Sequence, residues 1–442
     1  MSDAKANGFA LLPLVLFLSI FIGTGAYLNH HGAEMAFYQL SATVAILPAI
    51  ILSIFMGRDR LTLKIERFLH GAGDVNILTM CMIYLLAGAF ATVAESIGGV
   101  QATVNAGLSL IPASMVLPGL FIISAFIATA MGTSMGTVAA MTPIAVGVGD
   151  RIDLSLGLLV AAVVSGAMFG DNLSMISDTT IAATRTQGVE LKDKFKFNLL
   201  IAAPAALVTL IILLIFGTTG QVAPTESIEW IKVIPYLLIL GLAIAGVNVF
   251  VVLTAGLTLA GVIGLFSVPD YSLLIFSQDI YQGFVSMNEI FILSILIGGL
   301  GELIKSQGGI RYLIEVVERI TERYRAKAHH TKIGELGISG LVSLADICTA
   351  NNTVAILITG GIAKEIAMKN EVDPRRSASL LDIFSCVFQG IIPYGAQILL
   401  AGSIAKLSPI AIVGNMFYCF LLAGVAIIAI LTGFPKQSRL LN

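Results

Sequence analysis

The densest group of polar side chains in an apolar region of this 442-residue chain is GDNLSMISDTTIAATRTQG, from Gly170 to Gly188. Two carboxylates, Asp171 and Asp178, lie within it. An aspartate at the centre of a bilayer costs about 2.5–3.5 kcal/mol on insertion scales, so such a residue is a candidate for binding ions or protons. The other candidates in this segment are Asn172, Ser174, Ser177 and Thr179. A structural role, in which these groups hold a neighbouring helix, stays open.

Two further apolar regions also have polar midpoints. The first reads MGTSMGT, and its hydroxyl groups belong to Thr133, Ser134 and Thr137. Its two glycines would end a helix and expose backbone groups, which survive at membrane depth only when they are buried in protein or line a wet cavity. Close helix packing through the same glycines is the alternative.

The second polar midpoint reads LADICTANNTVA and offers oxygen donors of the kind that a hard cation such as Na⁺ prefers. These candidate ligands are Asp346, Asn351, Asn352 and Thr353. Capping of a hairpin turn is the alternative for the asparagines. Further along, QGIIPYGAQ has a proline and glycines that break a helix. Candidate contacts for a transported organic solute are Ser177, Thr179, Gln389, Tyr394 and Gln397.

One pattern points to an enzyme, because GTSMG matches the G-x-S-x-G arrangement of serine hydrolases. Such an enzyme needs a base, and the five histidines lie in predicted loops. There is no H-E-x-x-H motif and no Walker A glycine loop. We therefore expect no enzyme and no cofactor, with Na⁺ and H⁺ as transported or coupling ions.

The composition indicates the elements that position these residues. Apolar residues make up 57% of the chain and charged residues 12%, about half the charge of a soluble protein. Long apolar stretches without period-2 alternation predict an all-α polytopic membrane protein. The ten predicted crossings are 9–28, 38–57, 76–97, 155–185, 195–217, 229–247, 249–267, 286–305, 377–405 and 409–433. Segments 113–148 and 334–368 are predicted to be re-entrant helical hairpins.

The distribution of cationic residues predicts the orientation in the inner (cytoplasmic) membrane. With a cytoplasmic N-terminus, 22 of the 25 lysines and arginines fall on the cytoplasmic side, as the positive-inside rule expects. This count places Lys194 in a cytoplasmic loop. Both termini are then cytoplasmic.

The two halves of the chain, 1–217 and 218–442, are predicted to be repeats. SIGGV matches SQGGI at an offset of 210 residues, and the tripeptide TVA recurs at an offset of 216. Each half has five crossings, a hairpin and a broken helix (155–185 and 377–405). Because five is odd, the second half would enter the membrane from the opposite side, as in many secondary transporters.

GDNLSMISDTT resembles the G-D-x-x-S-x-x-S-D-T-T signature of the NhaC-type sodium–proton antiporter family, within the ion transporter superfamily. The hairpin tips look like the Ser-Asn-Thr sodium loops of that superfamily. The chain departs from the pattern at Ser134-Met135-Gly136, where an asparagine is expected, and at Met175, where the family has proline. The resemblance implies a homodimeric carrier with rocking or elevator-like motion.

The leading hypothesis is a Na⁺/H⁺ antiporter, in which Asp171 exchanges the two ions and Asp178 and Asp346 are charged neighbours. The alternative is a Na⁺- or H⁺-coupled transporter of a small organic acid or amino acid. A channel would need a continuous pore, which two opposed hairpins do not favour. The expected partners are small ions, a small organic solute in the alternative, and the lipid bilayer, but no nucleic acid.

Overall fold

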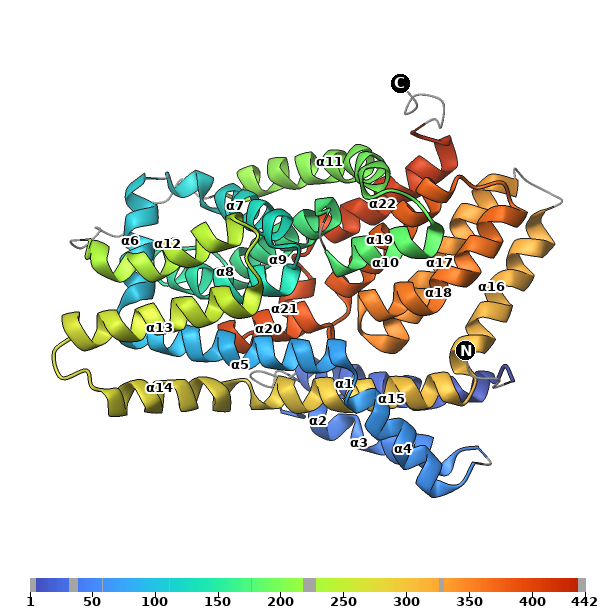
Figure 1. Ribbon diagram of the computed structural model, residues 1–442, viewed down its shortest axis with the longest axis horizontal. Coiled ribbons are helices and arrows are strands. Elements are labelled where there is room, and N and C mark those ends of the chain that lie inside the picture. The colour runs from blue at the N-terminus through green and yellow to red at the C-terminus, as the bar shows by residue number, and fades with distance from the viewer. Residues whose placement is uncertain are drawn as a thin grey trace.

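The structure is a computed structural model that describes residues 5–31, 39–57, 59–110, 112–175, 177–217, 228–325 and 330–435. Every regular element in these residues is a helix (Figure 1). The first half contains η1 (Gly8–Leu11), α1 (Leu12–His30), α2 (Ala42–Ala45), α3 (Leu47–Phe55), α4 (Leu61–Ala72), α5 (Val75–Ser96), α6 (Gly99–Leu110), η3 (Ala113–Met115), α7 (Val116–Met131), α8 (Ser134–Gly149), α9 (Leu156–Leu173), α10 (Asp178–Gln187) and α11 (Leu191–Phe216). The second half contains α12 (Trp230–Ile244), α13 (Val249–Ser267), α14 (Leu273–Ser286), α15 (Asn288–Ser306), α16 (Gly309–Arg325), α17 (His330–Thr349), α18 (Asn352–Lys369), α19 (Pro374–Ile391), α20 (Ala396–Ala405), α21 (Pro409–Val413) and α22 (Phe417–Thr432).

The surface of these helices is apolar where a soluble protein would be polar. Ile215, Phe55 and Phe266 are 74%, 80% and 86% exposed, whereas Lys194 and Asp346 are fully buried. A bilayer favours apolar side chains on the outer surface and polar groups in the interior, because lipid hydrocarbon cannot form hydrogen bonds or ion pairs with charged groups. The chain is a multi-pass membrane protein.

In the described residues, six helical segments are long and apolar enough to span a membrane, or seven if the pair α14–α15, bent by 42°, is one span. They are Gly8–Leu28, Val75–Ser96, Leu156–Gln187, Leu191–Phe216, Val249–Ser267 and Pro374–Ala405. Six of the ten predicted crossings coincide with these segments. The predicted crossings 38–57, 229–247 and 409–433 contain only shorter apolar helices, and α6 and α14 form where no helix was predicted. The count of ten therefore stays a prediction.

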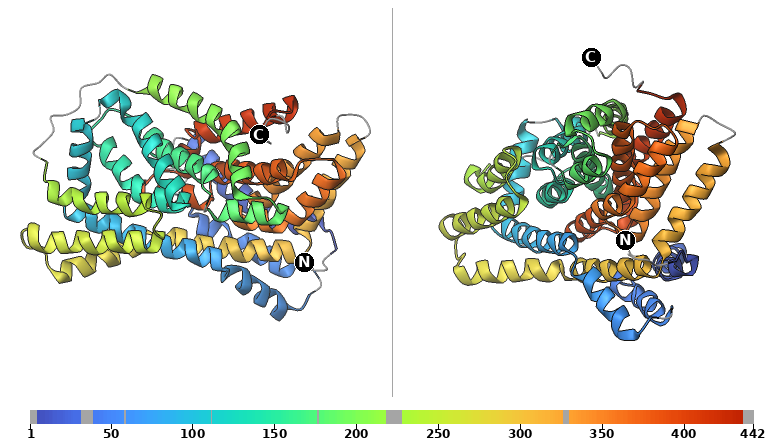
Figure 2. Two further views of the ribbon diagram at one scale, coloured as in Figure 1. Left: turned by 45° about the horizontal axis from the view of Figure 1, so that its top comes forward. Right: turned by 45° about the vertical axis from the view of Figure 1, so that its right-hand side comes forward.

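Two helical hairpins and two broken helices form the centre of the molecule. The first hairpin is α7–α8 and the second is α17–α18; the broken helices are α9–α10 and α19–α20. α7 and α8 pack against α9, and α8 also packs against α20. α17 and α18 pack against α19, and α18 also packs against α10. Each hairpin therefore contacts one broken helix from its own half and one segment from the other half (Figures 1 and 2).

The two hairpin tips turn with the same backbone conformation. Gly132 and Ala350 are left-handed, with φ of 68° and 49°, and each precedes an extended residue that caps the next helix. The caps are Thr133, which accepts a hydrogen bond from Gly136 N (3.4 Å), and Asn351, which accepts one from Val354 N (3.0 Å). These positions differ by 218 residues, so the TVA match at an offset of 216 is out of register with the tips. The inverted orientation of the two halves stays a prediction.

A second layer of helices lies beside this centre and supports it. α5 packs against α13, α14 and α15, and α15 packs against α4, which extends from the lower edge of Figure 1. Glycines allow the helices to approach closely: a Cβ added at Gly88 would lie 2.4 Å from Gly283 O. This contact fixes α5, whose other end reaches the hairpin tips.

Candidate functional site

The two hairpin tips meet at a cavity of about 90 Å³ between the broken helices. At about 30 Å³ of liquid volume for each water, this cavity has room for roughly three waters or a partly hydrated ion. Ten of the predicted site residues line it: Thr133, Ser134, Asp171, Asp178, Thr179, Asn351, Asn352, Thr353, Gln389 and Gln397. In the described part of the chain, no lysine or arginine lines this cavity.

Asp171 lies in the last turn of α9, and its residue is 6% exposed. The helix ends here because Ser174 is extended, and α10 begins after Ser177, whose hydroxyl oxygen accepts a hydrogen bond from Thr180 N (3.3 Å). The break leaves Asp171 facing the first hairpin, where Ser134 Oγ donates to its Oδ2 (2.9 Å). Asp178 is exposed, so it lies at a wetter side of the cavity than Asp171.

A chain of side chains connects Asp171 to a second buried carboxylate. Gln397 Nε2 donates to Ser134 Oγ (3.0 Å), and Gln389 Nε2 donates to Gln397 Oε1 (2.8 Å). With the Gln389 amide in the opposite orientation, its nitrogen donates to Asp346 Oδ1 (3.2 Å) and its oxygen accepts from Ala396 N (3.2 Å). The chain thus extends from Asp171 on α9 to Asp346 on α17.

Six predicted residues lie outside the cavity: Thr137, Asn172, Ser174, Ser177, Asp346 and Tyr394. Neighbours in a helix project about 100° apart, so residues beside a lining position point elsewhere. Asn172 Nδ2 donates to Tyr418 OH (3.3 Å), Thr137 Oγ1 donates to Thr133 O (3.1 Å), and Tyr394 OH donates to Ile347 O (2.7 Å). These side chains and Ser174 do not line this cavity, and their predicted roles in binding an ion or an organic solute stay predictions.

The sequence did not indicate that α5 contributes to the site. Asn76 and Thr79 line the cavity from its first turns. A polar pair at the start of an apolar span reads as the solvated end of a helix, so only the contact with the hairpin tips reveals them. Asp74 caps α5 and accepts hydrogen bonds from Asn76 N (2.9 Å) and Asn76 Nδ2 (3.1 Å).

A buried ion pair lies on the other side of the helix break. Lys194 and Asp382 are 0% and 1% exposed, and Lys194 Nζ lies 2.8 Å from Asp382 Oδ2. Lys194 was predicted in a cytoplasmic loop, but it is the fourth residue of α11 and points into the protein. Its partner is 188 residues away, so no local pattern could reveal the pair.

A second polar cavity, of about 160 Å³, adjoins the first. Asn76 and Asn351 line both cavities, and the second also contains His70, Asp74 and Glu302. Glu302 accepts an ion-pair hydrogen bond from Lys305 Nζ (2.8 Å). The two cavities are therefore neighbours that share the two asparagines as a common wall.

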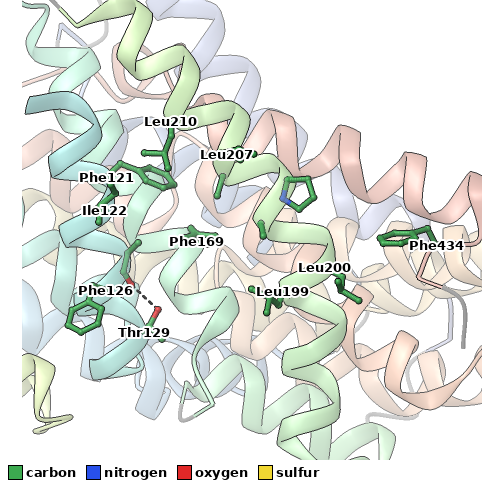
Figure 3. A pocket seen from close by; sticks show the side chains of 14 residues that line it. Phe121, Ile122, Phe126, Thr129, Phe169, Leu199, Leu200, Leu207, Leu210 and Phe434 are labelled. Atoms are coloured by element: carbon green, nitrogen blue, oxygen red, sulfur yellow. Dashed lines mark hydrogen bonds between the residues drawn. The ribbon is translucent and has the colours of Figure 1, made fainter. Parts of the chain in front are cut away.

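A third cavity, of about 880 Å³, is an apolar groove between α7 and α11 (Figure 3). Figure 3 shows Phe121, Phe126 and Leu207 along its walls. Thr129 contributes a polar group to this groove, and its hydroxyl donates to the carbonyl oxygens of Ala125 (2.8 Å) and Gly170 (3.2 Å). The groove therefore offers apolar contact and no ligand for an ion.

Sequence comparisons agree with this architecture. The model of the Na⁺/H⁺ antiporter family matches residues 14–218, which include the motif at 170–180. The malate-2H(+)/Na(+)-lactate antiporter of Bacillus subtilis is 24% identical over 424 residues, which cover 89% of each chain. The Na(+)/H(+) antiporter NhaC of the same organism is 26% identical over 397 residues, covering 82% of this chain and 84% of that protein.

A third relative differs in its cargo. The arginine/ornithine antiporter ArcD of Halobacterium salinarum is 23% identical over 324 residues, covering 66% of this chain and 65% of that protein. All three relatives are antiporters by name, and the family match spans the first hairpin and the helix break that carries Asp171. The chain is thus similar to the Na⁺/H⁺ antiporter family over residues 14–218 and to antiporters over most of its length.

Proposed function

We propose that this protein is a secondary active transporter that exchanges Na⁺ for H⁺ at the cavity between the hairpin tips. One observation carries the proposal: Asp171 lies buried at this cavity, hydrogen-bonded to Ser134 of the first hairpin. The match of residues 14–218 to the Na⁺/H⁺ antiporter family and the relative named as the Na(+)/H(+) antiporter NhaC support the choice of ions.

Na⁺ would bind at Asp171 through hard oxygen ligands. The Asp171 carboxylate and the Ser134 hydroxyl are already 2.9 Å apart. The amide oxygen of Asn352 and the hydroxyl of Thr353 come from the second hairpin tip. Such carboxylate, amide and hydroxyl oxygens suit a hard cation. With no cationic side chain among the described lining residues, the cation would be the counter-charge of Asp171.

The proton would be shared between Asp171 and Asp346 through the hydrogen-bond chain. With Asp171 ionised, donors point toward it from Ser134, Gln397 and Gln389 in turn. Asp346 would then be protonated, and its hydroxyl would donate a hydrogen bond to Gln389 Oε1. When both amides turn over, Asp171 carries the proton and donates to Ser134, and Gln389 Nε2 donates to an ionised Asp346. Na⁺ at Asp171 would favour the first arrangement, because protonation would remove the charge that the cation needs. Release of the proton from Asp346 to water would then complete the exchange, so that each Na⁺ bound displaces one proton from the protein.

Alternating access would come from the hairpins and broken helices moving against the layer of α5, α13, α14 and α15. Cross-packing of each hairpin on both broken helices makes this central group a single unit, which supports rigid-body motion. The distribution of lysines and arginines suggests an inner-membrane location with both termini in the cytoplasm. The family resemblance suggests a homodimer, in which each protomer consists of two inverted halves.

The test uses purified protein in proteoliposomes, with ²²Na⁺ uptake and internal pH recorded together. Asp171→Asn should abolish both signals. Asp346→Asn should keep Na⁺/Na⁺ exchange and lose the Na⁺-driven pH change, because the proton has lost its second carboxylate. Asp153→Asn, a substitution at an exposed aspartate before α9, is the matched control and should behave as wild type.

Two outcomes would contradict the proposal. The first is full exchange by folded Asp171→Asn. The second is a strict requirement for malate, lactate, arginine or another organic solute before any Na⁺ moves, which would favour coupled transport of organic acids or amino acids.

A further inference from the structure

The ammonium group of Lys194 is held entirely by oxygen atoms. Its Nζ lies 3.0 Å from Asn172 O, 2.5 Å from Thr180 Oγ1 and 2.8 Å from Asp382 Oδ2. A lysine ammonium has three hydrogen atoms to donate, so these three acceptors use all of them. We call this group of oxygen ligands the ammonium cage.

The ammonium cage straddles the break in α9–α10. Asn172 lies in the last turn of α9 and Thr180 in the first turn of α10. Thr180 Oγ1 also donates to Ser174 O (2.8 Å), within the break itself. Carbonyls at a helix C-terminus lack intrahelical partners and attract cations. The cage therefore holds a positive charge at the residue next to Asp171.

The residues that form and support the cage carry further buried oxygen atoms without a partner in the described part of the chain. Asn172 Oδ1, Asn198 Oδ1 and Asp382 Oδ1 are buried and have no hydrogen-bond partner in the described part of the chain. Asn198 Nδ2 donates to both Asn172 O (2.9 Å) and Asp382 Oδ2 (2.7 Å), so it holds two of the ligands in place. Buried acceptors of this kind are costly without a cation or a donor beside them.

The second broken helix shows that such a break does not need a buried cation. The two breaks align on their C-cap residues, Ser174 and Ile392, which are 218 residues apart. At the positions equivalent to the cage and its supports, the second break has Gly390, Ile398, Ile412 and Met416. Ile412, the equivalent of Lys194, is fully buried. The second break is therefore apolar where the first is charged.

We propose that the Lys194 side chain is a tethered cation that fills a second monovalent-cation site in the protein. The chemical class that this site takes is a primary ammonium, because three N–H donors match three converging oxygens. Without the lysine, the site would take such a cation from solution. The inference concerns a location behind Asp171 and does not depend on exchange at the main cavity.

The experiment measures binding by thermal stability of the purified full-length protein in detergent. Lys194→Ala empties the ammonium cage, and Lys194→Met fills the same volume with an uncharged side chain. Methylammonium chloride is the probe, and choline chloride at equal concentration controls for ionic strength. We expect a saturable rise in the melting temperature of Lys194→Ala with methylammonium over choline. Wild type and Lys194→Met should show no such rise.

Each other result has a defined meaning. If Lys194→Ala folds only when it is purified in methylammonium, the cage is supported. If it melts at the same temperature in both salts, or fails to fold in both, the proposal is wrong. A rise of equal size in wild type would mean that methylammonium acts elsewhere. Because no step requires transport, these outcomes are separate from those of the Asp171 and Asp346 variants.

Discussion

Asp171 and Asp346 illustrate what single residues contribute to this molecule. Both are buried, but Asp171 has the Ser134 hydroxyl as a donor, whereas Asp346 meets the Gln389 amide as a donor in one of the two orientations of that amide. An ionised carboxylate in a protein interior is tolerated only when hydrogen bonds or cations compensate it. The side chains between the two aspartates therefore determine which one can be ionised.

Removing the donor to Asp171 should weaken Na⁺ binding. Ser134→Ala deletes a hydrogen bond to a charged group, worth about 1.5–3 kcal/mol, and also a Na⁺ ligand. We expect the KM for Na⁺ to rise at least about tenfold, since 1.4 kcal/mol is a factor of ten. Initial rates of ²²Na⁺ uptake against Na⁺ concentration measure this change.

The control for Ser134→Ala is Ser165→Ala, at a buried serine in α9 whose hydroxyl faces Met416 Sδ (3.6 Å). That variant should keep the wild-type KM. If both variants had equal KM values, the Ser134 contact would have no role in the site.

At the scale of elements, the helix break works because α7 and α9 pack very closely. A Cβ added at Gly170 would lie 2.2 Å from Ala125 O and 2.6 Å from Ala128 Cβ. Gly170 directly precedes Asp171, so this contact sets where the carboxylate lies relative to the first hairpin. Small residues that let backbones approach are the usual way to hold helices together in a membrane.

Gly170→Ala should force α7 and α9 apart. Overpacking of this kind costs about 1–3 kcal/mol, and we expect a lower melting temperature in detergent together with slower exchange. Gly340→Ala in α17 is the matched control, because among the described residues no side chain and no backbone of another element lies within 4 Å of the added Cβ. That variant should be neutral or more stable, by up to about 1 kcal/mol. A Gly170→Ala protein as stable as wild type would show that the contact is easily relaxed.

At the scale of the whole molecule, the site lies between two structural groups. The hairpins and broken helices form one wall, and α5 forms the other through Asn76 and Thr79. The second cavity reaches the same asparagines from the side of Asp74 and Glu302. Ions could thus approach along carboxylates before they meet the hairpin tips.

Asp74→Asn should slow the capture of Na⁺ without altering the site. Asparagine caps a helix about as well as aspartate, so α5 should stay in place while the charge is lost. We expect the KM for Na⁺ to rise by roughly two- to fivefold at low salt with kcat unchanged, and the difference to shrink as ionic strength screens the charge. Uptake measured at two ionic strengths tests this.

Glu322→Gln, on the exposed face of α16, provides the comparison for loss of one surface charge. Asp74→Asn and Glu322→Gln should differ at low salt. If both variants raised the KM for Na⁺ by the same factor, the cause would be the net charge of the protein and not the position of Asp74 at the second cavity.

The sequence alone predicted a helical membrane protein and the segments that carry the chemistry. The predicted hairpin 113–148 contains α7 and all but the last residue of α8, and the predicted broken helix 155–185 contains α9 and most of α10. These features follow from local chemistry, because apolar length, glycine and capping side chains act within a few residues. Hydropathy also suggested full crossings where α12 and α22 have only 15 and 16 residues.

Tertiary structure decided which polar groups meet. Ten of the sixteen predicted site residues line one cavity, while Asn172 and Tyr394 point away from it. Lys194 is buried and not in the predicted loop, because Asp382, 188 residues away in the sequence, compensates its charge inside the protein. Such pairings depend on which helices pack side by side. The hydrophobic effect that drives packing is non-directional, so the apolar residues of one helix do not identify its neighbour. The local sequence determines which residues can bind ions, but contacts between the two halves of the chain determine how those residues are arranged.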